Sequence, residues 1–316
     1  MITVAGFNTA IDRTIDLDTL VAGRVQRARA ARQTPGGKGL HVAQTIAALG
    51  EPVRLVGLVD AAHRALIEDW LARRGVAFHG VAIDGDLRVC TALREADGRI
   101  TEILEPGPEL DPATRARLLQ MLGDCIDDSD VVVLSGSLPR GFSDRAYAQM
   151  LADIAQDVPC FVDASGAALR HAAEHAPFLI KPNRDEAEEL VGRRVDSVAD
   201  AAHVVRMLHA RGVAWPVVTL GASGAVGSDG RAVLHATIDA AHGDHPVGSG
   251  DCFLAGMAVA RMRGGDLAHA LRLGVACGAA NAAMPETGYA QRILVETLFQ
   301  RTAINDITAT AHPGEP

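Results

Sequence analysis

The sequence contains a short run, GSGD at residues 248–251, that places a carboxylate among small residues directly before an apolar helical segment. The backbone N–H groups of such a turn, together with those of the first helical turn, can point at one anion. The positive end of the helix dipole favours the same anion, so the run predicts a cradle for a phosphate chain. Asp251 would stand beside that phosphate, where a carboxylate can take the proton of an attacking hydroxyl. A side chain that only caps its helix is the alternative interpretation.

A second glycine-rich run, PGGKG at 35–39, also precedes a helical segment and places Lys38 at its N-terminal end. The run is not a Walker A loop, because that pattern needs glycine at the position of Arg32 and Ser or Thr at the position of Gly39. It is not a dinucleotide fingerprint either, since Val42 stands where the third glycine would be. An NAD-dependent oxidoreductase is therefore disfavoured, and Lys38 indicates contact with an anionic ligand through a different kind of loop.

Four further runs of small and polar residues each follow an apolar segment that reads as a buried strand. They lie at 135–139, 163–166, 181–186 and 221–224. The carboxyl ends of parallel strands meet at one edge of a sheet, and open α/β sheets bind their ligands there. We therefore expect these runs to converge on a single crevice.

The elements that must position these runs alternate along the chain between two hydrophobic periods. Short apolar segments without polar alternation are typical of strands buried on both faces of a parallel sheet; they lie at 2–4, 53–56, 131–134, 160–162, 178–180 and 217–220. Helical patterns lie between them, at 39–49, 65–74, 144–156, 184–191, 199–211, 251–263 and 266–284. Asp111 and Pro112 predict a further helix start, with Leu118, Leu119, Leu122 and Ile126 facing inward. The series predicts a three-layer α/β/α, doubly wound, mostly parallel sheet.

Two stretches interrupt this alternation, at 11–34 and 88–105, and the second has a hairpin signal at Asp97-Gly98. We interpret them as a small β-sheet lid over the carboxyl ends of the strands. No internal repeat or low-complexity block is visible, and residues 1–316 are expected to form a single domain, with residues 308–316 as a flexible tail.

Composition and charge exclude several classes of protein. The 316 residues are 48% hydrophobic and 22% charged, as in an ordinary globular protein. A formal charge of −9 provides no general attraction for nucleic acid, and seven Phe, two Trp and two Tyr are too few to stack on its bases.

Acidic residues near the N-terminus, at Asp12 and Asp16, predict neither a signal peptide nor a membrane span. Five cysteines without a CxxC pair favour a reduced, cytoplasmic location.

Taken in order, these runs resemble the ribokinase-like (PfkB) carbohydrate kinases, and within them the branch of 1-phosphofructokinase and tagatose-6-phosphate kinase. The resemblance extends from about residue 2 to residue 300. It rests on AID at 10–12, PGGKGLHVA at 35–43, EPGPEL at 105–110, SGSLP at 135–139, VDASG at 162–166, IKPNRDE at 180–186, TLGASGA at 219–225 and GSGDCFLAG at 248–256.

The resemblance implies a role for each matching residue. Asp251 would be the base that activates a sugar hydroxyl, while Gly248, Ser249 and Gly250 would hold the transferring phosphate. ATP would contact Lys181, Asn183, Glu186, Thr219, Gly221, Ser223, Gly224 and Asn281. Asn183 and Glu186 would also serve Mg²⁺, through water.

The sugar side of the site would consist of Asp12, Gly36, Gly37, Lys38, His41, Arg88 and Ser137. Lys38 and Arg88, with Arg24 and Arg27, are the candidates for a phosphate already on the substrate. The lid of this family often also makes a dimer contact, so a homodimer is expected.

Two residues on the sugar side depart from the branch. His41 stands where asparagine usually follows GGKGL, and Thr9 stands where proline usually lies between asparagine and alanine. Asparagine offers an amide donor and an acceptor to sugar hydroxyls, whereas imidazole is bulkier and can become positive near neutral pH. An altered acceptor preference is therefore expected.

The resemblance implies transfer of the γ-phosphoryl group of Mg-ATP to a ketohexose phosphate, and our first choice is fructose 1-phosphate, giving fructose 1,6-bisphosphate. The alternatives are tagatose 6-phosphate, fructose 6-phosphate, a free sugar or a nucleoside as acceptor. A non-catalytic sugar or nucleotide sensor is the alternative from another class. Neither nucleic acid nor a membrane is expected as a partner.

Two other patterns have a chemical interpretation. His242, Asp244 and His245 are residue types that bind metals, but their spacing in a predicted loop does not match a helical metal motif. Cys252 follows Asp251 at a helix N-terminus, where a thiol pKa can fall. Ordinary packing is the favoured interpretation of Cys252, and a thiol whose alkylation blocks the site is the alternative hypothesis.

Overall fold

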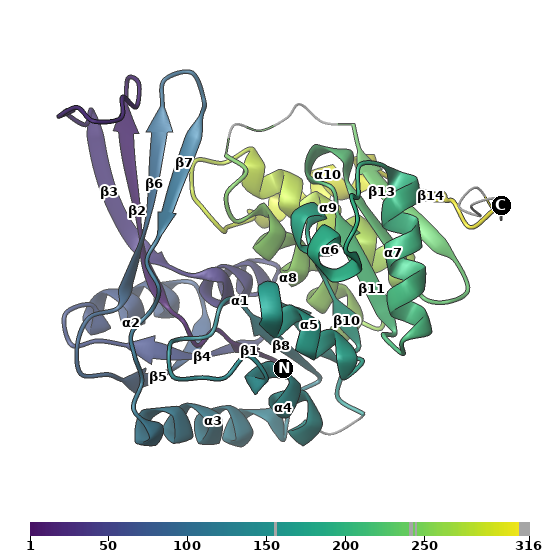
Figure 1. Ribbon diagram of the computed structural model, residues 1–316, viewed down its shortest axis with the longest axis horizontal. Coiled ribbons are helices and arrows are strands. Elements are labelled where there is room, and N and C mark those ends of the chain that lie inside the picture. Colours follow the sequence, from purple (N-terminus) through teal and green to yellow (C-terminus); the bar gives the residue numbers. More distant parts are fainter. Residues whose placement is uncertain (155–156, 240–242, 244, 310–316) are drawn as a thin grey trace.

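The computed structural model describes residues 1–154, 157–239, 243 and 245–309. A large sheet runs through the centre of the molecule (Figure 1). Its parallel part contains, in spatial order, β5 (Val76–Ala82), β4 (Val53–Val59), β1 (Ile2–Ala5), β8 (Val131–Ser135), β9 (Cys160–Asp163), β10 (Leu179–Ile180) and β11 (Trp215–Thr219). Antiparallel strands then continue the sheet: β12 (Ala225–Ser228), β13 (Val233–Ile238) and β14 (Thr302–Asp306).

Helices cover both faces of this sheet, which makes the fold the predicted three-layer α/β/α arrangement. One face carries α1 (Lys38–Ala48), α2 (Arg64–Arg73), α8 (Ser249–Met262), α9 (Leu267–Ala282) and α10 (Arg292–Arg301). The other face carries α3 (Pro112–Ile126), α4 (Ala146–Asp153), α5 (Gly166–Glu174), α6 (Arg184–Val191) and α7 (Val198–Ala210). A single 3₁₀ turn, η1 (Gly221–Ser223), follows β11.

Most differences from the predicted elements lie at edges and connections. The helix start at Asp111 is confirmed, since its carboxylate accepts hydrogen bonds from the N–H groups of Ala113 and Thr114. Leu119 was predicted to face inward but is 42% exposed, whereas Thr114 and Cys125 of the same helix are buried. The apolar pattern did not indicate β5, α5, α10, β13 or β14, because their half-buried faces mix polar and apolar residues. It also missed β12, which is buried but is only four residues long and contains glycine and serine.

A separate small sheet stands to one side of the large one, above α1 and α2 at the left of Figure 1. Its strands, in order, are β3 (Ala30–Gly36), β2 (Ala10–Leu17), β6 (Arg88–Glu95) and β7 (Ile100–Leu104). Strands β6 and β7 form the hairpin predicted at Asp97-Gly98, where Gly98 has a φ of 90°. The middle pair, β2 and β6, is parallel. The small sheet therefore joins the two stretches that the sequence set apart from the βα series.

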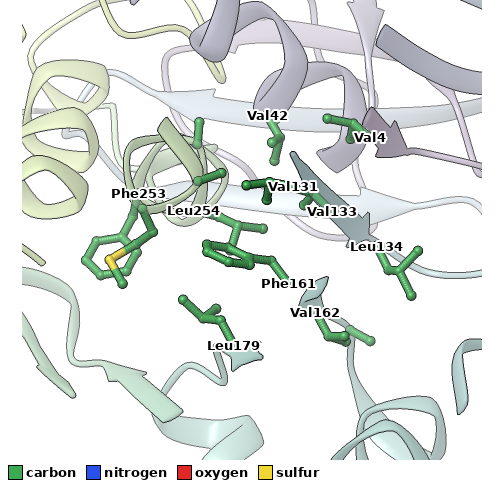
Figure 2. Close-up of a cluster of buried hydrophobic side chains, with 14 of the residues drawn as sticks. Val4, Val42, Val131, Val133, Leu134, Phe161, Val162, Leu179, Phe253 and Leu254 are labelled. Atoms are coloured by element: carbon green, nitrogen blue, oxygen red, sulfur yellow. The ribbon is translucent and has the colours of Figure 1, made fainter. Parts of the chain in front are cut away.

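The hydrophobic core fixes the start of α8 relative to the ends of the parallel strands. Figure 2 shows Phe253 and Leu254 of α8 beside Val42 of α1 and side chains from β1, β8, β9 and β10. Phe253 is 4% exposed and Leu254 is fully buried. Because these two residues follow Asp251 within one helical turn, their burial anchors the carboxylate at the edge of the sheet.

The remaining predictions concern the C-terminal tail, a membrane span, the cysteines, the cellular location and a dimer. Residues 310–316 lie outside the described residues, so the predicted tail stays a prediction there, while the Thr308 hydroxyl accepts a hydrogen bond from the Val233 N–H. No helix among the described residues is long and apolar enough to cross a membrane. The five cysteines are free. A cytoplasmic location and a dimer through the small sheet stay predictions.

Candidate active site

A cleft of about 880 Å³ lies between the small sheet and the carboxyl ends of the parallel strands. It brings together most of the residues singled out from the sequence, although they come from distant parts of the chain. The ones that line it are Asp12, Gly37, Lys38, His41, Arg88, Ser137, Lys181, Asn183, Glu186, Thr219, Gly221, Gly224, Gly248, Ser249, Gly250 and Asp251.

Five of the proposed site residues do not line this cleft. Arg24 and Arg27 lie exposed in the segment between β2 and β3. Ser223 turns its carbonyl toward His235, whose Nε2 lies 2.8 Å away. Gly36 and Asn281 lie behind residues that do line the cleft, and they support the site from there.

The turn before α8 offers unoccupied backbone donors to the cleft. The N–H groups of Ser249 and Asp251 donate to the carbonyls of Pro246 and Gly248, at 3.1 Å each. Those of Gly248 and Gly250 donate to no acceptor among the described residues. Gly248 has a φ of 84°, and a Cβ there would lie 2.5 Å from the Gly288 backbone nitrogen, so this position requires glycine. The two free amides at the N-terminus of a 14-residue helix suit an anion.

Asn281 holds this turn in place from α9. The residue is fully buried, and its Nδ2 donates to the Val247 carbonyl at 2.9 Å and to Ser249 Oγ at 3.0 Å. Its Oδ1 accepts a hydrogen bond from the Tyr289 N–H at 3.1 Å. Asn281 therefore fixes the turn without contacting the cleft itself.

The N-terminus of α6 forms another part of the cleft wall. The Asn183 side chain accepts a hydrogen bond from the Glu186 N–H, and the Glu186 carboxylate accepts one from the Asn183 N–H, at 2.9 Å each. This reciprocal capping box holds both side chains at the end of β10. Burial raises the pKa of Glu186, and the nearby Lys38 partly offsets that effect.

Asp163, at the end of β9, connects two lysines that line the cleft. Its Oδ1 lies 3.3 Å from Lys38 Nζ, and its Oδ2 lies 3.2 Å from Lys181 Nζ. Burial by itself would raise the pKa of Asp163, but the two ammonium groups hold it below its ordinary value. Its negative charge raises the pKa of Lys38 in turn. A Cβ on Gly250 would lie 3.6 Å from Lys181 Nζ, so this lysine stands at the anion turn.

The sequence placed Asp163 only in a loop after a strand and gave it no role. Its position in the VDASG run, directly at a strand end, was the signal available. Its two partners lie 125 and 18 residues away along the chain, so no local pattern indicates the pairing.

His41 joins the carboxylates of Asp12 and Asp251. Its Nδ1 lies 2.9 Å from Asp251 Oδ2, and its Nε2 lies 2.9 Å from Asp12 Oδ2. The three side chains are 7%, 17% and 8% exposed for His41, Asp12 and Asp251. Burial lowers the pKa of His41, but the hydrogen bonds and negative charges of the two aspartates prevail and raise it to about 10. The ring is therefore an imidazolium that donates to both carboxylates near neutral pH.

Two glycines leave room for this bridge. A Cβ on Gly36 would lie 2.1 Å from the Asp12 carboxylate carbon, and a Cβ on Gly288 would lie 2.1 Å from His41 Cγ. Any side chain at these positions would displace the groups that form the bridge. Gly36 thus forms a wall behind Asp12.

The rest of the cleft wall lies on the small sheet and near the end of β8. Arg88 Nε donates to the Asn8 carbonyl at 3.1 Å, and Asn8 Nδ2 donates to Ser137 Oγ at 2.9 Å. Glu102 of β7 also lines the cleft. Partial burial and the negative charges of Asp12 and Asp251 raise the pKa of Glu102. Nothing in the sequence indicated Glu102 as a site residue, and Asn8 entered only as part of the family pattern around Thr9.

Two other sequence hypotheses have a different outcome. Cys252 is fully buried, its Sγ lies 3.2 Å from Thr45 Oγ1, and burial raises its thiol pKa well above the ordinary value. The favoured interpretation of ordinary packing is confirmed and the alternative of a reactive thiol is wrong, because the cysteine is buried in the core. His242 and Asp244 lie outside the described residues, and no metal-binding group of three His, Cys, Asp or Glu residues occurs within the described part.

Two free amides, a carboxylate beside them and two lysines thus meet at one edge of a doubly wound sheet, which is an arrangement suited to an anionic ligand. The pfkB family carbohydrate kinase model matches residues 5–293, which is most of the chain. The chain therefore belongs to the PfkB family.

Solved structures share this fold over nearly the whole chain. Phosphofructokinase-2 from Escherichia coli, in complex with potassium, has a TM-score of 0.88 and 24% identity, covering 95% of this chain and 98% of that one. A Thermotoga maritima protein named "Possible 1-phosphofructokinase" has a TM-score of 0.87 and 20% identity, covering 96% and 99%. Arabidopsis thaliana ribokinase, complexed with ribose and ATP, has a TM-score of 0.76 and 22% identity, covering 95% and 98%.

Proposed function

We propose that this carbohydrate kinase transfers the γ-phosphoryl group of Mg-ATP to a ketohexose phosphate, with fructose 1-phosphate as acceptor and fructose 1,6-bisphosphate as product. One observation carries the proposal: Asp251 stands at the anion turn and, through His41, next to Asp12 of the acceptor side. A base, a phosphate cradle and sugar-side residues thus share one cleft.

The proposed reaction is an in-line transfer. The acceptor hydroxyl gives its proton to Asp251 while its oxygen forms a bond to the γ-phosphorus. The bond from that phosphorus to the β,γ-bridging oxygen breaks, and its electron pair leaves with ADP. Since the transition state is loose and spreads charge over the equatorial oxygens, positioning and positive potential provide most of the catalysis. The amides of Gly248 and Gly250 and the ammonium of Lys181 are the chain's own sources of that potential.

The nucleotide would occupy the side of the cleft formed by α6, β11 and η1. Lys181, Thr219, Gly221 and Gly224 line this side, as the family resemblance implies for an ATP site. The Arabidopsis neighbour was solved with ribose and ATP, which supports ATP as the donor.

Mg²⁺ fits the residues present at the N-terminus of α6. This ion commonly takes one or two carboxylates, keeps several waters and binds substrate phosphates. Glu186 supplies a carboxylate on the cleft wall, and Asn183 orients it through the capping box. When bound, the ion would neutralise charge on the phosphates, with these two residues holding it through water.

The phosphate already on the acceptor would face Arg88 and Lys38. Both line the cleft, and Lys38 is 39% exposed, so its ammonium group is accessible beside Asp163. The small sheet covers this half of the cleft and would keep water from the transferring phosphate.

An acceptor screen tests the proposal. Purified protein with Mg-ATP is assayed for ADP release against fructose 1-phosphate, fructose 6-phosphate, tagatose 6-phosphate, free sugars and nucleosides. We expect the highest kcat/KM with fructose 1-phosphate. Arg88→Ala should raise KM for that acceptor by about 10- to 100-fold, the value of a charge-assisted hydrogen bond, without changing KM for ATP.

Other outcomes would identify a different function. A free sugar as the best acceptor, together with indifference to Arg88→Ala, would show that the substrate is not phosphorylated. Nucleotide binding without ADP release for any acceptor would identify a sensor and would contradict the proposal.

A further inference from the structure

His41 has no hydrogen-bonding atom left for a sugar. An imidazole ring has two nitrogens, and both already lie 2.9 Å from a carboxylate oxygen. The expectation that His41 binds the substrate directly therefore does not follow from its position. Because both of its ring nitrogens contact carboxylates, His41 can act on a ligand in the cleft only through those two side chains.

We propose that His41 is a positioning residue that orients the base by tying the Asp251 carboxylate to Asp12 on strand β2 of the small sheet. The inference rests on the proposed function, in which Asp251 is the base. It assigns to this histidine a task different from the sugar contact that asparagine would make in the family branch.

The bridge leaves one defined oxygen on each carboxylate. His41 occupies Oδ2 of Asp251 and Oδ2 of Asp12, and no described residue donates to the Oδ1 atom of either one. These two free oxygens only accept hydrogen bonds, so they select neighbouring hydroxyl groups, which can donate. Recognition of the acceptor thus moves from residue 41 to the two carboxylates that the ring holds apart.

Charged groups face the ring from several elements. Asp12 lies on β2, Asp251 on α8, and Glu102 on β7 interacts electrostatically with all three members of the bridge. Lys38, on the same helix as His41, interacts with Asp251. Gly288 presents uncharged backbone to the ring face. Acidic groups outnumber basic ones around the ring, which keeps it protonated and makes the bridge a pair of charge-assisted hydrogen bonds.

Nuclear magnetic resonance of ¹⁵N-histidine-labelled protein tests the bridge without any assay of activity. We expect both His41 ring nitrogens to carry protons at pH 8, with titration near pH 10. Asp12→Asn and Asp251→Asn should each lower that titration point by about one to three units, because each removes one neighbouring charge. Titration of the wild-type ring below pH 7, or a titration point unmoved by both variants, would overturn the inference.

The stability that protonated His41 contributes to the folded protein should depend on pH in one direction. The folded-state pKa of His41, about 10, lies above its ordinary value of 6.5. The stabilisation is therefore fully present below pH 6.5 and is lost as the pH rises through 10. The difference in melting temperature between wild type and His41→Asn should shrink over this range, and a difference independent of pH would contradict the bridge.

The kinetics of a folded Gly288→Ala variant test whether the His41 ring positions Asp251. A Cβ at Gly288 would displace the His41 ring, and misplacement of a base by about 1 Å can cost about 100-fold in rate. We expect a lower kcat with unchanged ATP affinity. Gly75→Ala is the matched control, since Gly75 has a φ of 74° against 67° for Gly288 but has nothing within 4 Å of its Cβ position. Equal kcat in both folded variants would overturn the inference.

The outcomes distinguish this inference from the proposed function. If Asp251→Asn retains full turnover, the proposed base role fails whatever the ring titration shows. If turnover is lost in that variant while the wild-type ring titrates as an isolated imidazole, the bridge fails and the kinase proposal stands.

Discussion

The two halves of the cleft are built in different ways. The donor half consists of residues close together in the sequence, such as the Asn183–Glu186 capping box and the turn at 221–224 after β11. The acceptor half joins residues from separate elements: His41 pairs with Asp12 at a separation of 29 residues and with Asp251 at a separation of 210. One half is a set of local motifs, and the other exists only once the fold is complete.

This difference indicates which half of the cleft can accept substitutions in its sequence. A capping box accepts only a few residue types at each of its two positions, so the proposed donor half is constrained residue by residue. On the proposed acceptor half, the single imidazole of His41 occupies one oxygen of each of two carboxylates, so a substitution at this one position would change the hydrogen bonds of both. Substrate preference can therefore shift on the acceptor side while the phosphate side is unchanged.

The largest expected effect is a loss of kcat on substitution of Asp251, which lies where the two halves of the cleft meet. Asp251→Asn removes the proposed base and should lower kcat by about 10²- to 10⁴-fold. Affinity for ATP should stay within a few-fold, because the amides of Gly248 and Gly250 remain. Steady-state kinetics with isothermal titration of ATP measures both quantities.

Asp266→Asn is the control for that substitution. Asp266 caps α9 through the His269 N–H, and asparagine can serve as the same kind of cap. Its kcat should match that of the wild type. Full turnover in Asp251→Asn would end the assignment of the base.

The next effect concerns Asp163, which connects Lys38 of the acceptor half to Lys181 of the donor half. Asp163→Ala leaves the 4%-exposed Lys181 without its partner, which costs about 3–5 kcal/mol for a buried pair. Lys38 is 39% exposed and adds less. Urea unfolding should show this loss of stability.

A surface ion pair provides the comparison for Asp163. Asp128, which is 65% exposed, pairs with Arg54, and Asp128→Ala should cost less than about 1 kcal/mol. Equal losses in the two variants would show that Asp163 does not hold the halves together.

The smallest expected effect comes from a substitution that changes only the proposed donor half. Asn183→Ala removes the N-cap of α6 and should cost about 1 kcal/mol of stability while raising KM for ATP, with KM for the acceptor unchanged. Ser197 caps α7 in the same way but does not line the cleft. Ser197→Ala should therefore lose similar stability without a change in KM for ATP. A rise in both KM values for Asn183→Ala would mean that the halves are not independent.

Much of the fold could be predicted from the sequence because buried parallel strands have a strong local signal. The runs at 131–134 and 160–162 became β8 and β9, and the helix predicted at 184–191 has those bounds in the structure. The antiparallel strands β13 and β14 were missed, since their faces are only half buried and their pairing joins residues far apart in the chain.

The site divides in the same manner. Glycine runs before helices indicated where Gly248 and Lys38 would lie, and the polar run after a buried strand indicated Asn183, because these signals are local in the sequence. Nothing in the sequence indicated that Glu102 faces Asp251 or that Asp163 pairs with two lysines, since these contacts depend on how the sheets pack. His41 was noticed only as a departure from the family pattern, and its bridge became evident from the geometry alone.

The most direct test is a crystal structure with a non-hydrolysable ATP analogue, Mg²⁺ and the best acceptor from the screen. We expect the γ-phosphate within hydrogen-bond distance of the Gly248 and Gly250 amides, and the acceptor hydroxyl at Oδ1 of Asp251. A γ-phosphate bound elsewhere in the cleft, or an Asp251 carboxylate turned away from the acceptor, would contradict phosphoryl transfer at this turn.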